Sequence, residues 1–376
     1  MPADFVLEEA LLRVDWDELD HAYGAASDAP FHLLALVVGE DAGARGAAVG
    51  YLDAAMLHQG SVYSASGPFI RIVAGLLADH RTAGIVDNVL PWDAGPRPLR
   101  TALLDHIAVF AEACRFDVPD DVLRAEACPA GRGEADLQRI SAAARAADWR
   151  LDPDPATRKP PPPELVEAYE DEEFGRAMAA RDLLACRAVV PDIFQDVLPL
   201  TGDPEPSVRI SALTAAVHLV AHPALREQRP TVIGRLERAA AAPEPRARAA
   251  VARLLGMLGA APERLLRDEH PGVRACAALG QEGWLRCDLA QVLVARVDTI
   301  EAVLPAALGL AAMTDGRTYD RDLGLFVRLA FPEPLTEDTE LTNAQRTFLA
   351  ALIAHGHVRR EQTRLIPTGE ASDRQS

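Results

Sequence analysis

PSVRISAL, at residues 206–213, is one of three copies of a single pattern in this chain. The other copies are PRARAAVA at residues 245–252 and PGVRACAA at residues 271–278. Each copy opens with proline, has arginine three residues later and continues with apolar residues at helical spacing. Proline suits the first turn of a helix, because its missing N–H would have no partner there. The pattern therefore predicts that three helices begin at these prolines.

An acidic loop residue precedes each copy, and the dipole at the start of a helix favours negative charge there. These residues are Asp203, Glu244 and Asp268. Weaker copies of the pattern occupy residues 44–49 and 98–103. Stacked helical pairs bury their apolar faces only against neighbouring copies, so this recurrence predicts a repeat architecture along much of the chain.

The pattern resembles the first helix of HEAT repeats, especially in their short bacterial form. The resemblance implies an all-α fold, an α-solenoid of HEAT-like helical hairpins. It also implies that Arg209, Arg248 and Arg274 form a structural ladder of contacts to acidic residues in neighbouring turns. The three copies begin 39 and then 26 residues apart, whereas HEAT units span about 40 residues. At least one unit is therefore expected to have a truncated second helix.

The chain has 376 residues, more than one hydrophobic core usually serves, so we expect two lobes or one elongated array. Aromatic residues make up only 5% of the chain, and its alanine-rich stretches suit thin, closely packed helices rather than a large β-sandwich. The predicted helices include residues 16–26, 164–190 and 193–198, with a break between the last two.

The clearest predicted boundary is residues 151–163, where four consecutive prolines follow an Asp-Pro-Asp-Pro run. Such a stretch disfavours a helix and favours an extended polyproline conformation. We interpret it as a linker, a hinge or spacer between an N-terminal HEAT-like lobe (1–150) and a C-terminal HEAT-repeat lobe (164–366). Residues 367–376 are polar and predicted to form a flexible tail.

The formal net charge of −18 repels phosphate backbones and attracts basic proteins. We therefore expect a basic protein or peptide as the partner, and no free nucleic acid. The five cysteines include no CxxC pair, which argues against a disulfide framework and a structural zinc site. The first residues lack the positive charge of a signal peptide, and no apolar stretch approaches the ~20 residues of a membrane span. These features predict a cytoplasmic protein that does not enter membranes.

The most individual stretch is the polar loop HQGSVYSASGP at residues 58–68. As a functional site it would offer His58 as an acid or base, with Gln59 beside it and Tyr63 as a hydrogen-bond donor. As a structural loop it would turn at Gly60, cap the next helix with a serine and pack Tyr63 between helices. The sequence alone leaves both hypotheses open.

Two further candidates lie elsewhere. Trp92, in a segment rich in proline and glycine, could anchor a partner, join Tyr23 in a pocket beside the polar loop, or plug a gap in the solenoid. An acidic run that opens the helix after the linker includes Glu167, Glu170 and Asp171. It could dock a basic partner or a cation, or it could be a solvated cluster stabilised by the helix dipole.

No metal site and no cofactor are predicted. His218 and His222 have the spacing at which two imidazoles can share a metal, but no third ligand or glutamate base is evident nearby. The sequence contains no GxSxG elbow, Walker A loop or strand followed by GxGxxG. Single cysteines such as Cys186 and Cys276 are expected to be buried as small apolar residues.

Three hypotheses of function follow. The first is a protein–protein interaction scaffold or adaptor whose acidic concave surface binds a basic protein or peptide, as an inhibitor or immunity factor would. The second is an enzyme or small-ligand-binding protein with a pocket around His58 and Tyr63, because helical-repeat folds can host chemistry. The third is an architectural protein that self-associates or stiffens a complex. The first is favoured, since no catalytic signature rises above chance.

Overall fold

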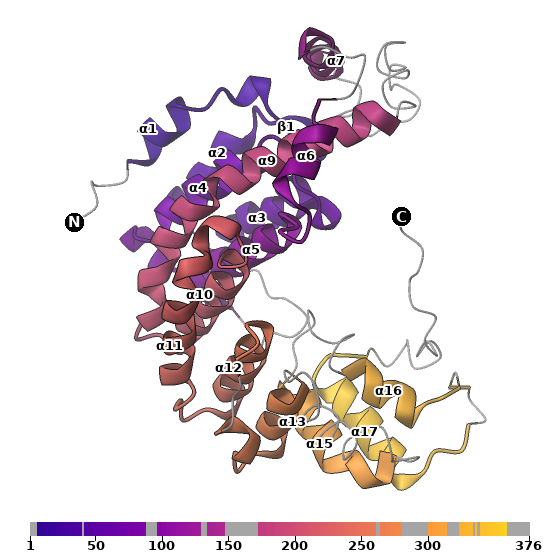
Figure 1. Ribbon diagram of the computed structural model, residues 1–376. Helices are drawn as coiled ribbons and strands as arrows, with labels where there is room; N and C mark the ends of the chain where they lie inside the picture. Colours follow the sequence, from indigo (N-terminus) through magenta and orange to yellow (C-terminus); the bar gives the residue numbers. More distant parts are fainter. Residues whose placement is uncertain are drawn as a thin grey trace. The chain divides into compact units, whose positions relative to one another are not determined.

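The computed structural model describes residues 6–39, 41–87, 96–128, 134–146, 172–260, 264–279, 300–313, 323–333, 335–336 and 339–358. Within these ranges the chain is predominantly helical (Figure 1). Two pairs of two-residue strands are antiparallel. The predicted all-α class is therefore confirmed. The described residues up to Arg229 form one compact unit, and those from Pro230 onward form a second.

The described part of the first unit contains helices, single helical turns and two pairs of short strands. Its helices are α1 (Leu7–Leu12), α2 (Ala29–Val38), α3 (Ala42–Tyr51), α4 (Ser66–Leu76), α5 (Leu99–Ala113), α6 (Asp120–Glu126), α7 (Glu134–Ala146), α9 (Glu172–Val197) and α10 (Pro206–Leu219). Its single turns are η1 (Trp16–Glu18), the π-helical η2 (Leu52–Met56), η3 (His58–Gly60), η4 (His80–Ala83), η5 (Leu198–Gly202) and η6 (Pro223–Gln228). The strands β1 (Asp20–His21) and β2 (Gly24–Ala25) pair with each other, as do β3 (Ile85–Val86) and β4 (Arg97–Pro98).

The helices of the first unit pack against one another in pairs. α2 packs on α3, α4 on α9 and α5 on α10, while α2 also touches α4 and α3 touches α5. Fully buried Phe69, Phe110 and Phe194 come from α4, α5 and α9. A Cβ atom at Gly67 of α4 would lie only 3.3 Å from the Cα of Cys186 in α9, so the two helices approach closely. Cys186 is fully buried, as predicted.

The second unit contains α11 (Arg229–Ala239), α12 (Pro245–Met257), η7 (Leu265–Arg267), α13 (Pro271–Leu279), α15 (Ile300–Met313), α16 (Gly324–Ala330) and α17 (Asn343–Ala354), α11 beginning at the division. α12 packs on α13, α13 on α15, and α15 on α17. A Cβ atom at Gly272 would lie 2.5 Å from the carbonyl oxygen of Gly309, so α13 can approach α15 only because residue 272 has no side chain.

An arginine in the first turns of each pattern helix fastens the loop that precedes it. The Nη1 atoms of Arg209, Arg248 and Arg274 donate to the carbonyl oxygen six residues earlier, at 2.6, 3.1 and 2.7 Å respectively. Arg45, in the weaker copy that opens α3, makes the same bond at 2.9 Å. The spacing that recurs in these copies of the pattern therefore corresponds to one repeated local contact.

This contact differs from the ladder that the HEAT resemblance implies. Arg248 does reach an acidic residue of the next loop, because its Nε and Nη2 donate to the Asp268 carboxylate at 2.7 and 3.0 Å. Those hydrogen bonds hold the pKa of Asp268 below its ordinary value. The bonds of Arg209 and Arg274 to other described residues go to backbone carbonyls of their own preceding loops. The implied ladder is thus formed at one of its three positions within the described residues.

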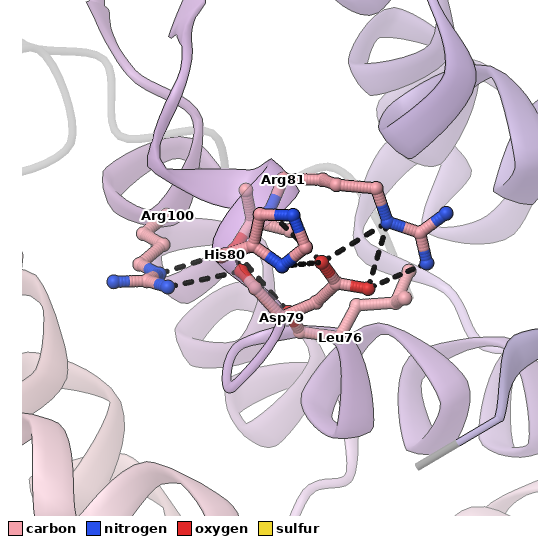
Figure 2. A network of polar contacts seen from close by, with 6 residues as sticks. Leu76, Asp79, His80, Arg81 and Arg100 are labelled. Atoms are coloured by element: carbon pink, nitrogen blue, oxygen red, sulfur yellow. Dashed lines mark hydrogen bonds and ion pairs between the residues drawn. The ribbon is translucent and has the colours of Figure 1, made fainter. Parts of the chain in front are cut away.

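A polar network closes the turn between α4 and α5 (Figure 2). The Asp79 carboxylate caps η4 by accepting from the backbone N–H of Arg81 at 2.8 Å, and it also binds the Arg81 guanidinium. Arg100 of α5 donates Nε to the Thr82 hydroxyl at 3.0 Å and Nη2 to the Asp79 carbonyl at 2.9 Å. Arg100 belongs to the weaker copy at residues 98–103, and it too fastens a turn that precedes its helix.

Arg187 of α9 joins segments that lie far away in the sequence. Its buried guanidinium donates to the carbonyls of Cys114 (2.8 Å), Val118 (2.9 Å) and Arg115, and to the Asp120 carboxylate (2.7 Å). The carbonyls lie at and just beyond the end of α5, where the helix dipole favours a positive charge. Arg187 therefore fixes α9 to the end of α5 and the start of α6.

Two helix predictions are corrected by the structure. Residues 16–26 do not form a helix: they contain η1 and the β1–β2 hairpin, where Gly24 has a φ of 130°. The Trp16 indole donates to the Leu11 carbonyl at 3.1 Å, and its ring packs on Phe69. These contacts stabilise a non-helical conformation of the segment. α9 also runs unbroken through Pro191, because its buried face packs on α4 and α6 and offsets the lost backbone hydrogen bond.

The division between the compact units lies elsewhere than the predicted linker at residues 151–163. Described residues on both sides of that stretch belong to the first unit, because α9 packs on α4 and α6. The units divide instead between Arg229 and Pro230. The linker and the tail at residues 367–376 lie outside the described residues, so their conformations stay predictions.

Candidate functional site

The β1–β2 hairpin brings Tyr23 to His58 in η3. The Tyr23 hydroxyl lies 3.3 Å from His58 Nδ1, and the two rings meet edge to face with centroids 5.4 Å apart. Both side chains are partly exposed. The structure therefore places together two residues that the sequence assigned to one candidate pocket.

The backbone beside His58 has an unusual conformation. The π-helical turn η2 ends at Met56, and Gln59 then has φ 53° and ψ 29°, the left-handed region that costs a residue with a Cβ atom about 1–2 kcal/mol. Gly60 follows with a φ of 74°. Two consecutive left-handed residues reverse the chain here and hold the His58 ring beside the hairpin.

The rest of the polar loop is anchored by its serines. The Ser66 hydroxyl accepts from the Tyr63 backbone N–H at 2.8 Å and donates to the Met56 carbonyl at 2.6 Å. The Ser64 hydroxyl accepts from the Asp20 backbone N–H at 2.7 Å. The turn at Gly60 agrees with the structural hypothesis for this loop, but neither serine caps the next helix, because the N-cap of α4 is Ala65 and makes no side-chain hydrogen bond. The serines instead fasten the loop to the hairpin and to the end of η2.

Asp28, which sequence reasoning missed, is the centre of a hydrogen-bonded cluster next to the hairpin. Its Oδ1 lies 3.1 Å from His21 Nε2 and accepts from the Tyr51 hydroxyl at 2.8 Å. His21 Nδ1 accepts from the Tyr23 backbone N–H at 3.0 Å, so the proton of the neutral ring lies on Nε2 and is donated to Asp28. The His32 ring stacks on Tyr51 with centroids 3.7 Å apart and planes 10° apart.

The cluster sets the charge state of its members. Burial works to raise the pKa of Asp28, but the hydrogen bonds from His21 and Tyr51 outweigh it and hold that pKa below its ordinary value. Burial, aided by the hydrogen bond to Asp28, raises the pKa of Tyr51. Burial lowers the pKa of His32, although the Asp28 charge opposes this. At neutral pH, Asp28 is therefore ionised, Tyr51 protonated and His32 uncharged.

This arrangement suits binding better than proton transfer. Both ring nitrogens of His21 are engaged within the cluster, and Tyr51 keeps its proton, so neither can accept a proton from a substrate. The Asp28 side chain is half exposed, and both of its hydrogen bonds use the same oxygen. Its carboxylate therefore retains the capacity to accept a hydrogen bond from a bound group.

The outer face of α2, which starts immediately after Asp28, is apolar and exposed. Phe31 is 71% and Val38 63% exposed, and the two residues are separated by two helical turns. The opposite face of α2 is buried through Ala29, Leu33, Leu36 and Val37. A helix that is apolar on both faces is usually covered on both, so the outer face of α2 is a candidate contact surface.

Negative charge is concentrated in the N-terminal part of the sequence, which contains α2. Residues 1–41 contain ten carboxylates and one arginine. Glu8 and Glu9 of α1 and Asp17 of η1 are exposed, and Asp41, exposed just beyond α2, caps α3 by accepting from a backbone N–H. α1 and α2 both pack on α4, so Glu8 and Glu9 of α1 belong to a helix that shares a neighbour with α2.

A second carboxyl with a displaced pKa lies on α9. Burial, followed by the negative charge of Asp20, raises the pKa of Asp182 to about 7, while the charge of Arg181 opposes the shift. Such a pKa is found in general acids and also in carboxyls that are merely buried. Its direct consequence here is that the stability of the first unit depends on pH.

The other predicted site residues are not brought to this cluster by the described structure. Trp92, Glu167, Glu170 and Asp171 lie outside the described residues and stay predictions. His218 and His222 contact separate groups, since His218 Nδ1 lies 3.4 Å from a Glu112 carboxylate oxygen and the His222 ring packs on Phe116.

Within the described ranges, no three histidine, cysteine or acidic side chains are grouped closely enough to hold a metal ion. Among the described helices, none combines the length and the apolar character needed to cross a bilayer. Comparisons of the chain with protein-family models, curated proteins and solved structures find no match.

Proposed function

We propose that this chain is an α-solenoid of HEAT-like hairpins that acts as a scaffold or adaptor for a basic protein or peptide. The order of packing supports the repeat architecture, because the pattern helices α3, α5 and α10 touch in succession, as do α12 and α13. The shared bond from Arg45, Arg209, Arg248 and Arg274 to the carbonyl six residues earlier supports a common origin for these helix starts.

The concentration of carboxylates in residues 1–41 is the observation that carries the proposed function. A folded segment with this charge attracts cationic surfaces over about a Debye length and speeds their encounter. Glu8 and Glu9 lie in α1, Asp17 and Glu18 in η1, and Asp20 in β1, so the positions of these five carboxylates along the backbone are set by the fold. A partner with clustered lysine or arginine would replace water and counterions at this surface.

The test compares two variants of equal net charge. One neutralises four exposed carboxylates of the acidic segment: Glu8→Gln, Glu9→Gln, Asp15→Asn and Asp17→Asn. The other neutralises four exposed carboxylates of the second unit: Glu237→Gln, Glu244→Gln, Glu333→Gln and Glu340→Gln. The probe is a fluorescein-labelled oligo-arginine peptide, whose binding is measured by fluorescence anisotropy over a range of salt concentrations.

The wild-type chain should bind the peptide with an affinity that falls steeply with salt. The first variant should bind about fivefold or more weakly and with a shallower salt dependence, while the second changes by less than about twofold. Equal losses in both variants would show that net charge alone attracts the peptide. Absence of binding by the wild-type chain would contradict the proposed function itself.

The contact between Tyr23 and His58 favours a second candidate, a small-ligand-binding site on the first unit. A ligand that binds there raises the thermal midpoint of the folded chain by mass action. A library of small metabolites screened by thermal shift would identify it as a compound that stabilises the wild type and the His80→Ala variant but not His58→Ala. His80 serves as the control because its side chain is 94% exposed.

A further inference from the structure

α2 presents two apolar stripes on opposite faces. One stripe is buried in the first unit, as described above. The other contains Phe31, Leu34, Ala35 and Val38, at the spacing i, i+3, i+4 and i+7 that places residues on one face of a helix. Its two ends, Phe31 and Val38, are among the most exposed large apolar side chains of the described structure.

A carboxylate lies at each end of this outer stripe. Asp28 stands three residues before Phe31, and Asp41 three residues after Val38. Asp28 is held in place by His21 and Tyr51, and Asp41 by its role as the cap of α3. The two charges are therefore fixed relative to the apolar residues between them.

Contacts with other aromatic rings also restrain Phe31, the first residue of this outer stripe. The Phe31 ring meets the His32 ring edge to face at 5.3 Å, and His32 in turn stacks on Tyr51. A side chain that is ordered before binding loses less conformational entropy when a partner covers it. The outer stripe thus has the properties of a preformed contact surface.

We propose that the outer face of α2 docks an amphipathic helix of the basic partner, with apolar side chains on Phe31 and Val38 and a lysine or arginine on Asp28 and on Asp41. The proposal rests on the proposed function and adds the site and the form of the partner. Helix pairs of this kind are recognised through anchors about one turn apart. The charges select the occupant: a second copy of this acidic chain and an anionic lipid surface would both be repelled.

The probe is a fluorescein-labelled peptide of about 18 leucine and lysine residues ordered to form an amphipathic helix, roughly 27 Å long. A scrambled peptide of the same composition, whose leucines do not share a helical face, is the first control. The variants are Phe31→Ser with Val38→Ser, and Asp28→Asn with Asp41→Asn, since asparagine can keep the structural hydrogen bonds. Val122→Ser is the matched control, because Val122 of α6 is 44% exposed and apolar.

The wild-type chain should bind the ordered peptide about tenfold more tightly than the scrambled one. The Phe31/Val38 variant should lose that preference but keep the salt-dependent binding of both peptides, whereas the Asp28/Asp41 variant should bind the ordered peptide more weakly. Val122→Ser should bind as the wild type does, and circular dichroism shows that each variant is folded.

Unchanged peptide preference in the Phe31/Val38 variant would overturn the proposal and leave the proposed function standing. A wild-type chain that binds neither peptide would overturn both. Light scattering provides a further check: a wild-type dimer that becomes monomeric in the Phe31/Val38 variant would assign the face to self-association and overturn the docking of a basic helix. Binding of the wild type to anionic vesicles that this variant loses would likewise overturn it.

Discussion

Arg187 and Arg274 both donate to backbone carbonyls, but they act over different lengths of chain. Arg274 binds the loop immediately before its own helix, whereas Arg187 of α9 binds segments 67 to 73 residues away. Arg274 is exposed and Arg187 is buried. The first contact sets where a helix starts, and the second sets which helices meet. We therefore expect substitutions at the two positions to differ greatly in cost.

The largest effect is expected at Arg187. Arg187→Ala should lower the free energy of unfolding of the first unit by about 3–5 kcal/mol, because it leaves buried carbonyls without their donor and leaves the Asp120 carboxylate with Arg124 alone. Urea denaturation followed by circular dichroism measures the loss. Arg187→Lys keeps the charge but lacks the planar fork, so it should recover less than half of the stability. Full recovery by lysine would show that charge alone matters there.

A smaller loss is expected at Gly272, which lies within the repeated pattern but serves a long-range contact. Gly272→Ala should destabilise the second unit by about 1–3 kcal/mol, because the new methyl group would strike the Gly309 carbonyl of α15. Gly234→Ala in α11 is the control, since a Cβ atom there would lie 3.8 Å from its nearest neighbour, an Arg238 side-chain nitrogen. Equal thermal midpoints for the two variants would contradict the close approach of α13 and α15.

Arg248 and Arg274 sharpen the comparison within the second unit. Arg248→Ala should cost about 1–2 kcal/mol, since Arg248 combines the local bond with a bidentate pair to Asp268. Arg274→Ala should cost less than about 0.5 kcal/mol, because its contacts are local and exposed. At acid pH the costs of the two substitutions should become more similar. The pKa of Asp268 is lower in the folded chain than in the unfolded chain, so the stability that ionised Asp268 contributes is lost as pH falls through the folded pKa.

A stabilising effect is expected at Asp182, on the same helix as Arg187 but with the opposite charge. Its pKa of about 7 lies above the ordinary value of 3.8, so the folded chain binds the extra proton between these values and its stability falls as pH rises across that window. Asp182→Asn should therefore be more stable than the wild type at pH 8, by about 1 kcal/mol. Urea denaturation at several pH values would test this, and a parallel pH dependence in both proteins would exclude Asp182 as its source.

The contrast between local and long-range contacts also explains which elements the sequence could predict. The starts of α10, α12 and α13 follow from proline, a preceding carboxylate and apolar spacing, all of which act within about ten residues. The hairpin at residues 20–25 was missed because the packing of Trp16 on Phe69, 53 residues further along, overrides the local helical pattern. The continuity of α9 through Pro191 depends likewise on its packing against α4 and α6.

The candidate site was predictable only in part. Tyr23 and His58 were assigned to one pocket, and the hairpin does bring them together. The outer face of α2 carried a usable signal, because APFHLLALVV is apolar on every side. The cluster around Asp28 carried none, since His21, Asp28 and Tyr51 come from a strand, a helix start and a helix end that only the fold brings together.

The π-helical turn η2 has a consequence for insertions and deletions. Each residue of an α-helix advances the rotation about its axis by about 100°, and a π-helical turn accommodates one residue more than an α-helical turn. Removing one residue from Leu52–Met56 would restore regular winding, but it would swing Asp53 away from His106 Nε2, now 2.9 Å distant, and His58 away from Tyr23. The number of residues in Leu52–Met56, more than their identity, therefore sets the orientation of His58 toward the β1–β2 hairpin.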